Sequence, residues 1–410
     1  MSLSRESSFP LPERTGQAAA LGVLVLTLSW ALLHVGFWDR QQIVDTPVYQ
    51  NYGEAVLDGQ VPYRDFGLEY PPAALPAFVL PALAADDDYA PAFELLMWLC
   101  GAAAIVFLAY TLTEIGAGPA RLYAAVMFLG LAPLALGSVV LSRYDLWPAA
   151  LTIAALAAFV SGRDRLGFGV VGLATAAKIY PVVLLPLALV WVGRRRGSRE
   201  VWIGLACFAA VLAACVVPFA ILAPDGVVDS LQRQLARPLQ IESLGAAVLL
   251  AAHRLGAYDP AVVSSSGSQN LDGALPDALA AIQTALQAAA LVAVWALFAL
   301  RARGREALLV ASAAAVTAFV AFGKVLSPQF LIWLLPLVPA VAGGAGLAGG
   351  AVLAAALVTT QLWFPYRYWD VVALAPASWL VLVRDLLLVA LFAILLVALS
   401  RRRSEEPHSA

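Results

Sequence analysis

Residues 39–72 read DRQQIVDTPVYQNYGEAVLDGQVPYRDFGLEYPP, a polar stretch in a chain that is otherwise mostly apolar. This stretch holds four aspartates, two glutamates and four tyrosines. The whole chain has 410 residues, of which 62% are hydrophobic and 13% charged, and its mean hydropathy is +0.83. Such values are typical of polytopic membrane proteins. We therefore expect residues 39–72 to lie in a loop outside the lipid and to carry the function.

The apolar segments predict an all-α membrane protein. Windows of about 20 apolar residues indicate about twelve spanning helices. Short arginine-rich connectors fall on one side of them, and the positive-inside rule makes that side, together with both termini, cytoplasmic. The expected spans lie near residues 17–36, 91–113, 119–138, 145–161, 166–178, 180–193, 200–222, 278–300, 306–323, 329–343, 347–364 and 377–400.

Two segments need separate treatment. Residues 72–85 are apolar, but as a helix they reach only about 21 Å, short of the roughly 30 Å hydrocarbon layer. Pro76 and Pro81 also interrupt them. We expect an interfacial helix on the outer surface. Residues 166–193 lie between two arginine-rich connectors, which predicts a hairpin of two short helices that turns at residues 178–181.

The expected domain organisation follows from these spans. A single transmembrane domain covers residues 17–400, between cytoplasmic tails 1–16 and 401–410. Its two large extracytoplasmic loops are residues 37–90 and 223–277. The three cysteines lie in apolar segments and predict no disulfide.

Each large loop is expected to contain an amphipathic helix at the membrane surface. In the first loop Thr46 and Pro47 are typical of a helix start and Gly59 of a helix end. The apolar stripe of that helix is expected to comprise Val48, Tyr52, Ala55 and Val56. In the second loop, a similar helix is expected over residues 243–255, ended by Gly256.

Ionisable residues gather at the predicted outer boundary, where a charge is costly and often functional. Cations from separate helix ends that face a few carboxylates suit a site that holds a phosphate while a base activates a hydroxyl. Each of these residues, taken alone, is equally compatible with interfacial anchoring or helix capping. The acids are Asp39, Asp45, Glu69 and Asp145, and the bases are Arg143, Lys178, Arg233, Arg237, Lys324 and Arg367.

Several motifs, in this order, resemble the GT-C superfamily of glycosyltransferases. They are DTPVYQNYGEAVLDGQVPYRDFGLEYPP, SRYDLWPA, GLATAAKIYP, RPLQIESLGA and GKVLSPQFLIWLLP. The polyprenol-phosphate-mannose-dependent branch of actinobacteria, glycosyltransferase family 87, is the most similar. The resemblance covers roughly residues 20–345 and implies a GT-C fold with two juxtamembrane helices in the first extracytoplasmic loop. It also implies a role in glycolipid biosynthesis at the cell envelope.

The resemblance also implies roles for individual residues. The family's loop aspartate matches Asp45, the expected general base of an inverting transfer. The family's donor sugar and acceptor vary, so the resemblance does not fix the sugar. Mannose is the expected one, with a polyprenyl phosphate as its carrier and a lipid-linked glycan or polysaccharide as its acceptor. The cations expected to hold the donor phosphate are Lys178, Lys324, Arg143 and Arg237. The residues expected to contact substrate are Tyr49, Glu69, Tyr70, Asp145, Tyr180, Gln240, Glu242 and Gln329.

Three alternatives remain open at this stage. Tyr49, Tyr63, Tyr70 and Trp147 are candidates for stacking on sugars, but aromatic residues also anchor proteins at the interface. Twelve spans also suit a transporter or a lipid flippase, although the charged residues gather at one face rather than near the bilayer midplane. Some GT-C enzymes use a divalent metal. The polar loop has carboxylates but no compact ligand motif, so we expect no metal and no other cofactor.

Arg384 and Asp385 lie inside the last predicted span. Neighbours in sequence do not face one another on a helix. We therefore expect each to find a partner on another helix.

Overall fold

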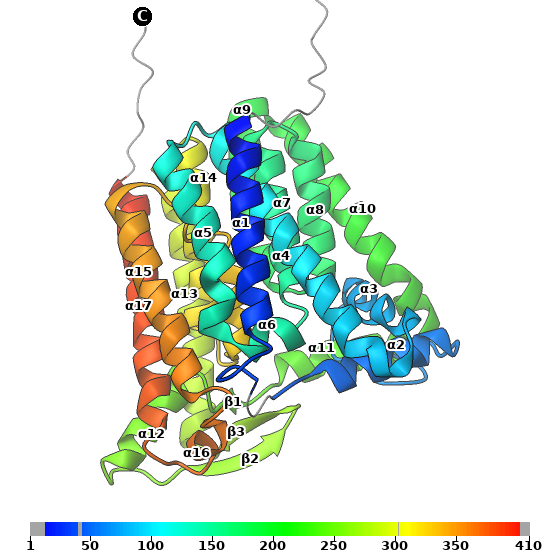
Figure 1. The fold of residues 1–410 in the computed structure, drawn as a ribbon, viewed down its shortest axis with the longest axis vertical. Coiled ribbons are helices and arrows are strands. Elements are labelled where there is room, and N and C mark those ends of the chain that lie inside the picture. Colours follow the sequence, from blue (N-terminus) through cyan, green and yellow to red (C-terminus); the bar gives the residue numbers. More distant parts are fainter. Residues whose placement is uncertain (1–12, 40–42, 302, 402–410) are drawn as a thin grey trace, which may run out of the picture.

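The computed structural model describes residues 13–39, 43–301 and 303–401, and it shows a helical bundle with a small sheet at one end (Figure 1). Seven described helices are long and apolar enough to cross a membrane, so the protein is a multi-pass membrane protein. They are α1 (Glu13–Leu32), α4 (Tyr89–Glu114), α5 (Pro119–Leu136), α10 (Ser198–Leu222), α13 (Ala274–Leu300), α15 (Gly343–Trp363) and α17 (Ser378–Arg401).

Shorter helices fill the middle of the bundle. They are α7 (Leu146–Val160), α8 (Asp164–Ala177), α9 (Leu185–Arg196) and α14 (Arg305–Ala321). α8 ends before Lys178, and the 3-10 helix η4 (Tyr180–Leu184) leads into α9, so the predicted hairpin turn is confirmed.

The expected spanning helix over residues 329–343 is wrong. The structure has the 3-10 helix η5 (Pro328–Leu334), followed by turns. Pro336 and Pro339 supply no backbone N–H, which prevents a regular helix. Residues 331–338 are buried inside the protein, which allows irregular backbone at this depth.

The arginine-rich connectors share one end of the bundle. Arg196 donates to the carbonyl of Gly162 at 2.7 Å, and Arg305 donates to the carbonyl of Glu114 at 2.7 Å. The start of α1 and the end of α17 lie at this same end, at the top of Figure 1. Assignment of this end to the cytoplasm stays a prediction from the positive-inside rule.

The polar loops gather at the opposite end. The first loop forms α2 (Thr46–Leu57), followed by the short helices η1 (Pro72–Ala74), α3 (Leu75–Val79), η2 (Pro81–Leu83) and η3 (Asp86–Asp88). Residues 72–85 therefore do not form a spanning helix. The remaining short helices are α6 (Ser138–Ser142), α11 (Pro224–Leu235), α12 (Leu244–Arg254) and α16 (Tyr368–Val372).

The all-helical membrane fold is confirmed, and the second loop adds a small three-stranded antiparallel sheet to it. β1 (Leu239–Gln240) pairs with β3 (Ser268–Asp272), which also pairs with β2 (Ala261–Ser265). Ser266 and Gly267 both have positive φ angles and form the two-residue turn of the β2–β3 hairpin. Serine-rich strands give a weak sequence signal, because strand propensity favours β-branched and aromatic residues.

Helix α2 begins after Asp45, as expected, and Gly59 follows its end with a φ of +83°. Its buried face is centred on Tyr49 and Gly53. Of the predicted apolar stripe, Val48 is 44% exposed, while Tyr52, Ala55 and Val56 are half-buried. A Cβ on Gly53 would lie 2.4 Å from the carbonyl oxygen of Phe78, so only glycine allows α2 this close to α3.

Candidate active site

Asp45 and Arg143 form an ion pair between the N-terminal end of α2 and the connector that follows α6. The Tyr49 hydroxyl donates to the same carboxylate oxygen at 3.3 Å. Arg143 also donates to the carbonyl of Ile43 at 3.4 Å. The Arg143 side chain is 7% exposed, whereas that of Asp45 is 31% exposed. The buried guanidinium thus orients a carboxylate that stays accessible from outside the bundle.

A second carboxylate lies deeper. Asp145 precedes α7 and is fully buried, and one of its oxygens accepts from Lys178 Nζ at 2.6 Å and from Trp333 Nε1 at 2.6 Å. Asp145 and Lys178 lie in two separate connectors, and Trp333 lies in η5. Burial lowers the pKa of Lys178, and the charge of Asp145 opposes that shift. Asp145 therefore serves to hold Lys178 charged inside the protein.

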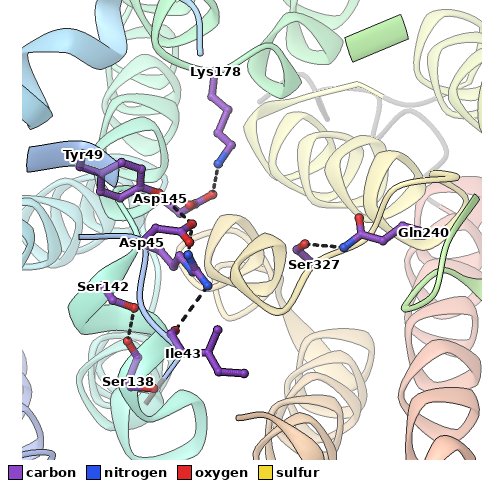
Figure 2. Close-up of polar contacts among 10 residues, drawn as sticks. Ile43, Asp45, Tyr49, Ser138, Ser142, Asp145, Lys178, Gln240 and Ser327 are labelled. Atoms are coloured by element: carbon purple, nitrogen blue, oxygen red, sulfur yellow. Dashed lines mark hydrogen bonds and ion pairs between the residues drawn. The ribbon is translucent and has the colours of Figure 1, made fainter. Parts of the chain in front are cut away.

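The two ion pairs belong to one cluster, which is drawn in Figure 2 with Asp45 and Asp145 close to the Tyr49 hydroxyl. The ring of Tyr144 bridges the pairs: Lys178 Nζ lies 4.5 Å from its centroid, and the Tyr49 ring packs edge-on to it at 5.8 Å. Burial lowers the pKa of Arg143 to about 10, while Asp145 raises it. The cluster holds two cations and two carboxylates.

Gln240 and Glu242 form the next group, beside β1. Gln240 donates to the carboxylate of Glu242 and, at 2.9 Å, to the hydroxyl of Ser327. Glu242 is 2% exposed, and its burial raises its pKa to about 7, with opposing contributions from Arg384 and Arg143. A neutral Glu242 and a charged one are therefore both accessible near neutral pH.

Arg384 corrects the expectation for the last helix. Its Nε donates to Asp385 at 2.6 Å, so the two neighbours do pair with each other. Arg384 also donates to the carbonyl of Glu242 at 2.6 Å. A long arginine side chain can bend back to an adjacent carboxylate, which the argument from helical spacing alone does not consider.

Arg237 and Lys324 bind neutral oxygen atoms, whereas Arg143 and Lys178 bind carboxylates. Arg237 donates to the Ser268 hydroxyl and Lys324 to the carbonyl of Leu235, both at 2.9 Å. In the part of the chain that the structure describes, neither forms an ion pair with a carboxylate. Burial lowers the pKa of both side chains, and the charge of Glu69 opposes this shift at Arg237.

The remaining predicted residues lie around this cluster. Tyr70 packs edge-on to Tyr144 at 5.0 Å. The rings of Tyr49 and Tyr180 are buried and stack on Phe78 and Trp333, at 4.5 and 4.1 Å, so protein atoms already cover them. Glu69 is exposed in the first loop and Gln329 half-buried in η5.

Three of the predicted residues lie outside this cluster, and one residue of the cluster was not predicted. Asp39, Arg233 and Arg367 are exposed at the surface. Trp333 was not predicted, although it is an aromatic residue within the quoted FLIW motif. Among residues 13–39, 43–301 and 303–401 no three His, Cys, Asp or Glu side chains converge as a metal would require.

Together the fold and the site define a class: a multi-pass membrane protein with a paired acid-and-cation site at one end of its bundle. The model of glycosyltransferase family 87 matches residues 68–328, and the chain belongs to this family. The protein is thus a membrane glycosyltransferase, which decides against the transporter interpretation. The match includes Arg143, Asp145 and Lys178, while Asp45 precedes it.

The crystal structure of ArnT from Cupriavidus metallidurans bound to undecaprenyl phosphate is similar in arrangement. The two chains share 13% sequence identity with a TM-score of 0.49, over 95% of this chain and 78% of ArnT. A likeness this distant says nothing about the lipid that this chain binds. No curated protein matches the chain.

Proposed function

We propose that the protein transfers mannose from a polyprenyl-phosphate donor to a lipid-linked glycan on the extracytoplasmic face, with inversion at the anomeric carbon. The observation that carries this proposal is the Asp45 carboxylate, which is accessible and fixed by the buried Arg143.

Asp45 is the general base in this mechanism. It removes the proton from an acceptor hydroxyl, whose oxygen then attacks the anomeric carbon of the donor. The bond from that carbon to the phosphate oxygen breaks, and polyprenyl phosphate leaves with the electron pair. The Tyr49 hydroxyl, 3.3 Å from the carboxylate, helps to orient it.

The leaving phosphate requires cations whose charge is not already neutralised by a carboxylate. Asp45 and Asp145 already compensate Arg143 and Lys178. We therefore assign the main contact with the phosphate to Arg237 and Lys324, which form no ion pair with a carboxylate of the described residues. Lys178 and Arg143 then position the carboxylates.

The lipid tail of the donor is proposed to lie against the bundle from the membrane side. Helix α10 has only Gly204 and Phe208 buried along its length, so most of its apolar surface faces outward. Such a surface suits contact with acyl or prenyl chains.

The test is transfer of labelled mannose from polyprenyl phosphate to a membrane glycolipid fraction by purified protein, with and without EDTA. Asp45→Asn is expected to reduce the rate by about 10²–10⁴-fold, the usual contribution of a general base. Asp58→Asn, an exposed carboxylate at the far end of α2, is the matched control and should retain activity. Full activity of Asp45→Asn would contradict the proposal.

A further inference from the structure

A cavity of about 540 Å³ lies between the first loop and α11, and Tyr52 of α2 also lines it. The first loop contributes Tyr63 to Glu69 and α11 contributes its polar face, while Arg237 and Ser266 lie at the edge next to the sheet. Of the residues given a role above, Glu69 and Arg237 line this cavity.

The walls of this cavity are held together by specific contacts. Ser230 donates to the carbonyl of Leu68 at 2.8 Å, and Gln234 donates to the carbonyl of Glu69 at 3.1 Å. A Cβ on Gly226 would lie 1.8 Å from the carbonyl oxygen of Tyr63, so α11 packs directly on the loop backbone. The loop and α11 are therefore fixed in one arrangement.

Tyr63 holds an unfavourable backbone conformation at this contact. Its φ is +69°, a region that bulky residues rarely adopt. Its hydroxyl donates to the carbonyl of Tyr70 at 2.5 Å, and its ring packs on Phe219 of α10. Backbone strain of this kind persists where the surrounding structure holds it in place, and it concentrates at binding sites.

Charges in the cavity are mixed rather than of one sign. The carboxylates of Glu69 and Asp229, the guanidiniums of Arg233 and Arg237 and the amide of Gln234 all line it. Planar carboxylates, guanidiniums and amides of this kind bind neighbouring hydroxyl groups through paired hydrogen bonds. Tyr52 and Phe66, stacked at 5.7 Å, add an aromatic wall. A hydroxyl-rich, uncharged ligand, such as a sugar, fits this lining better than a phosphate does.

Helix α11 also places the cavity at the lipid surface. Its polar face lines the cavity through Gly226, Asp229 and Arg233. On the other face the apolar side chains Val228, Leu231 and Leu235 are 51%, 51% and 69% exposed. A helix with one polar and one apolar face lies in the membrane interface. α11 follows directly on the outward-facing α10, and Figure 1 shows it at the end of the bundle opposite the chain termini.

We propose that this cavity binds a sugar of the acceptor other than the one that is attacked, and that the acceptor is a membrane-anchored glycolipid. Tyr52 follows Asp45 by seven positions, or about 10 Å along the helix axis, a separation that one hexose ring does not span. The bound sugar would set which hydroxyl reaches Asp45. This inference rests on the proposed function and adds the acceptor's subsite to it.

The test measures label transfer from polyprenyl-phosphate mannose to vesicles of total polar lipids from the native membrane. The double variant Asp229→Asn/Arg233→Gln alters two exposed side chains and is expected to fold. It should raise the half-saturating lipid concentration by about tenfold or more, because bonds to charged groups are lost. The half-saturating donor concentration and donor hydrolysis without acceptor should stay within about twofold. Gln232→Ala, exposed on α11 outside the cavity, is the control.

The outcomes separate this inference from the proposed function. Unchanged acceptor saturation in the double variant, or a shift in donor saturation instead, would overturn the role of the cavity and leave the transferase intact. Water-soluble glycan released from the same lipids by mild alkali should saturate only at concentrations about tenfold higher or more, because it lacks the anchor. Equal saturation would overturn the glycolipid assignment. Absence of transfer by the unaltered protein would contradict the proposed function itself.

Discussion

Lys178 Nζ lies 2.6 Å from a carboxylate oxygen of Asp145, and the two side chains are 14% and 1% exposed. Trp333 donates to the same oxygen. This pair joins the turn after α8 to the start of α7, in the same cluster as the accessible Asp45. Its removal is therefore expected to disturb both stability and activity.

Lys178→Met should lower the free energy of unfolding by about 3–5 kcal/mol, because it leaves a buried carboxylate without its cation. The double variant Lys178→Met/Asp145→Asn should recover part of that loss, since no charge is then buried alone. Reversible unfolding in mixed detergent micelles measures both. Arg165→Ala, which breaks the exposed pair with Glu200 at the other end of the bundle, should change little. Equal losses in the single and double variants would show that the pair is not coupled.

Much of this arrangement follows from sequence patterns, and the reason is local. Apolar segments mark most of the helices, arginines mark the connectors at one end, and the glycine after α2 marks its end. Even the turn at Lys178 follows from the short length between two basic connectors. Each of these features depends on neighbouring residues, so a single sequence contains it.

Contacts between distant residues were not predictable in this way. Asp145 meets Trp333 across 188 positions, and Gln240 meets Ser327 across 87. Nothing near these residues indicates the partner, because tertiary packing alone selects it. The β2–β3 hairpin was missed for another reason, namely that its serine-rich strands resemble a flexible linker.

Glu242 should make stability depend on pH. Burial raises its pKa from the ordinary 4.5 to about 7 in the folded protein. Its contribution to stability is fully present below pH 4.5 and is lost as the pH rises through 7, because the unfolded chain releases the proton first. Glu242→Gln should remove this loss and stabilise the protein at pH 8 by on the order of 3 kcal/mol.

The free energy of unfolding of the wild type and of Glu242→Gln is measured between pH 5 and pH 8, and its slope against pH is compared. Asp272→Asn provides the control, because this carboxylate is exposed on β3 of the same sheet. Its pH profile should match that of the wild type. Parallel profiles for Glu242→Gln and the wild type would mean that Glu242 stays ionised throughout.

Gly226→Ala should separate α11 from the first loop, because the added methyl meets the Tyr63 carbonyl oxygen at 1.8 Å. Overpacking of this kind costs about 1–3 kcal/mol. Amide hydrogen exchange at the loop residues 63–70 should become faster, with little change in the distant α14. Gly350→Ala in α15, where no atom lies within 4 Å of the new methyl, is the matched control. Unchanged exchange in Gly226→Ala would mean that α11 does not hold the loop.

Arg384 and Asp385 are both fully buried in α17, and Arg384 also donates to the carbonyl of Glu242. Arg384→Met should cost about 3–5 kcal/mol, because Asp385 then lacks its cation. Arg384→Met/Asp385→Leu should cost less than the single change, as both buried charges disappear together. Because Arg384 connects the last helix to the loop of Glu242, the double variant should still lose part of its transferase rate even where stability recovers. Unfolding and label transfer, measured on the same preparations, give the stability and the transferase rate of each variant. A double variant less stable than Arg384→Met would show that opposite charges do not hold the pair together.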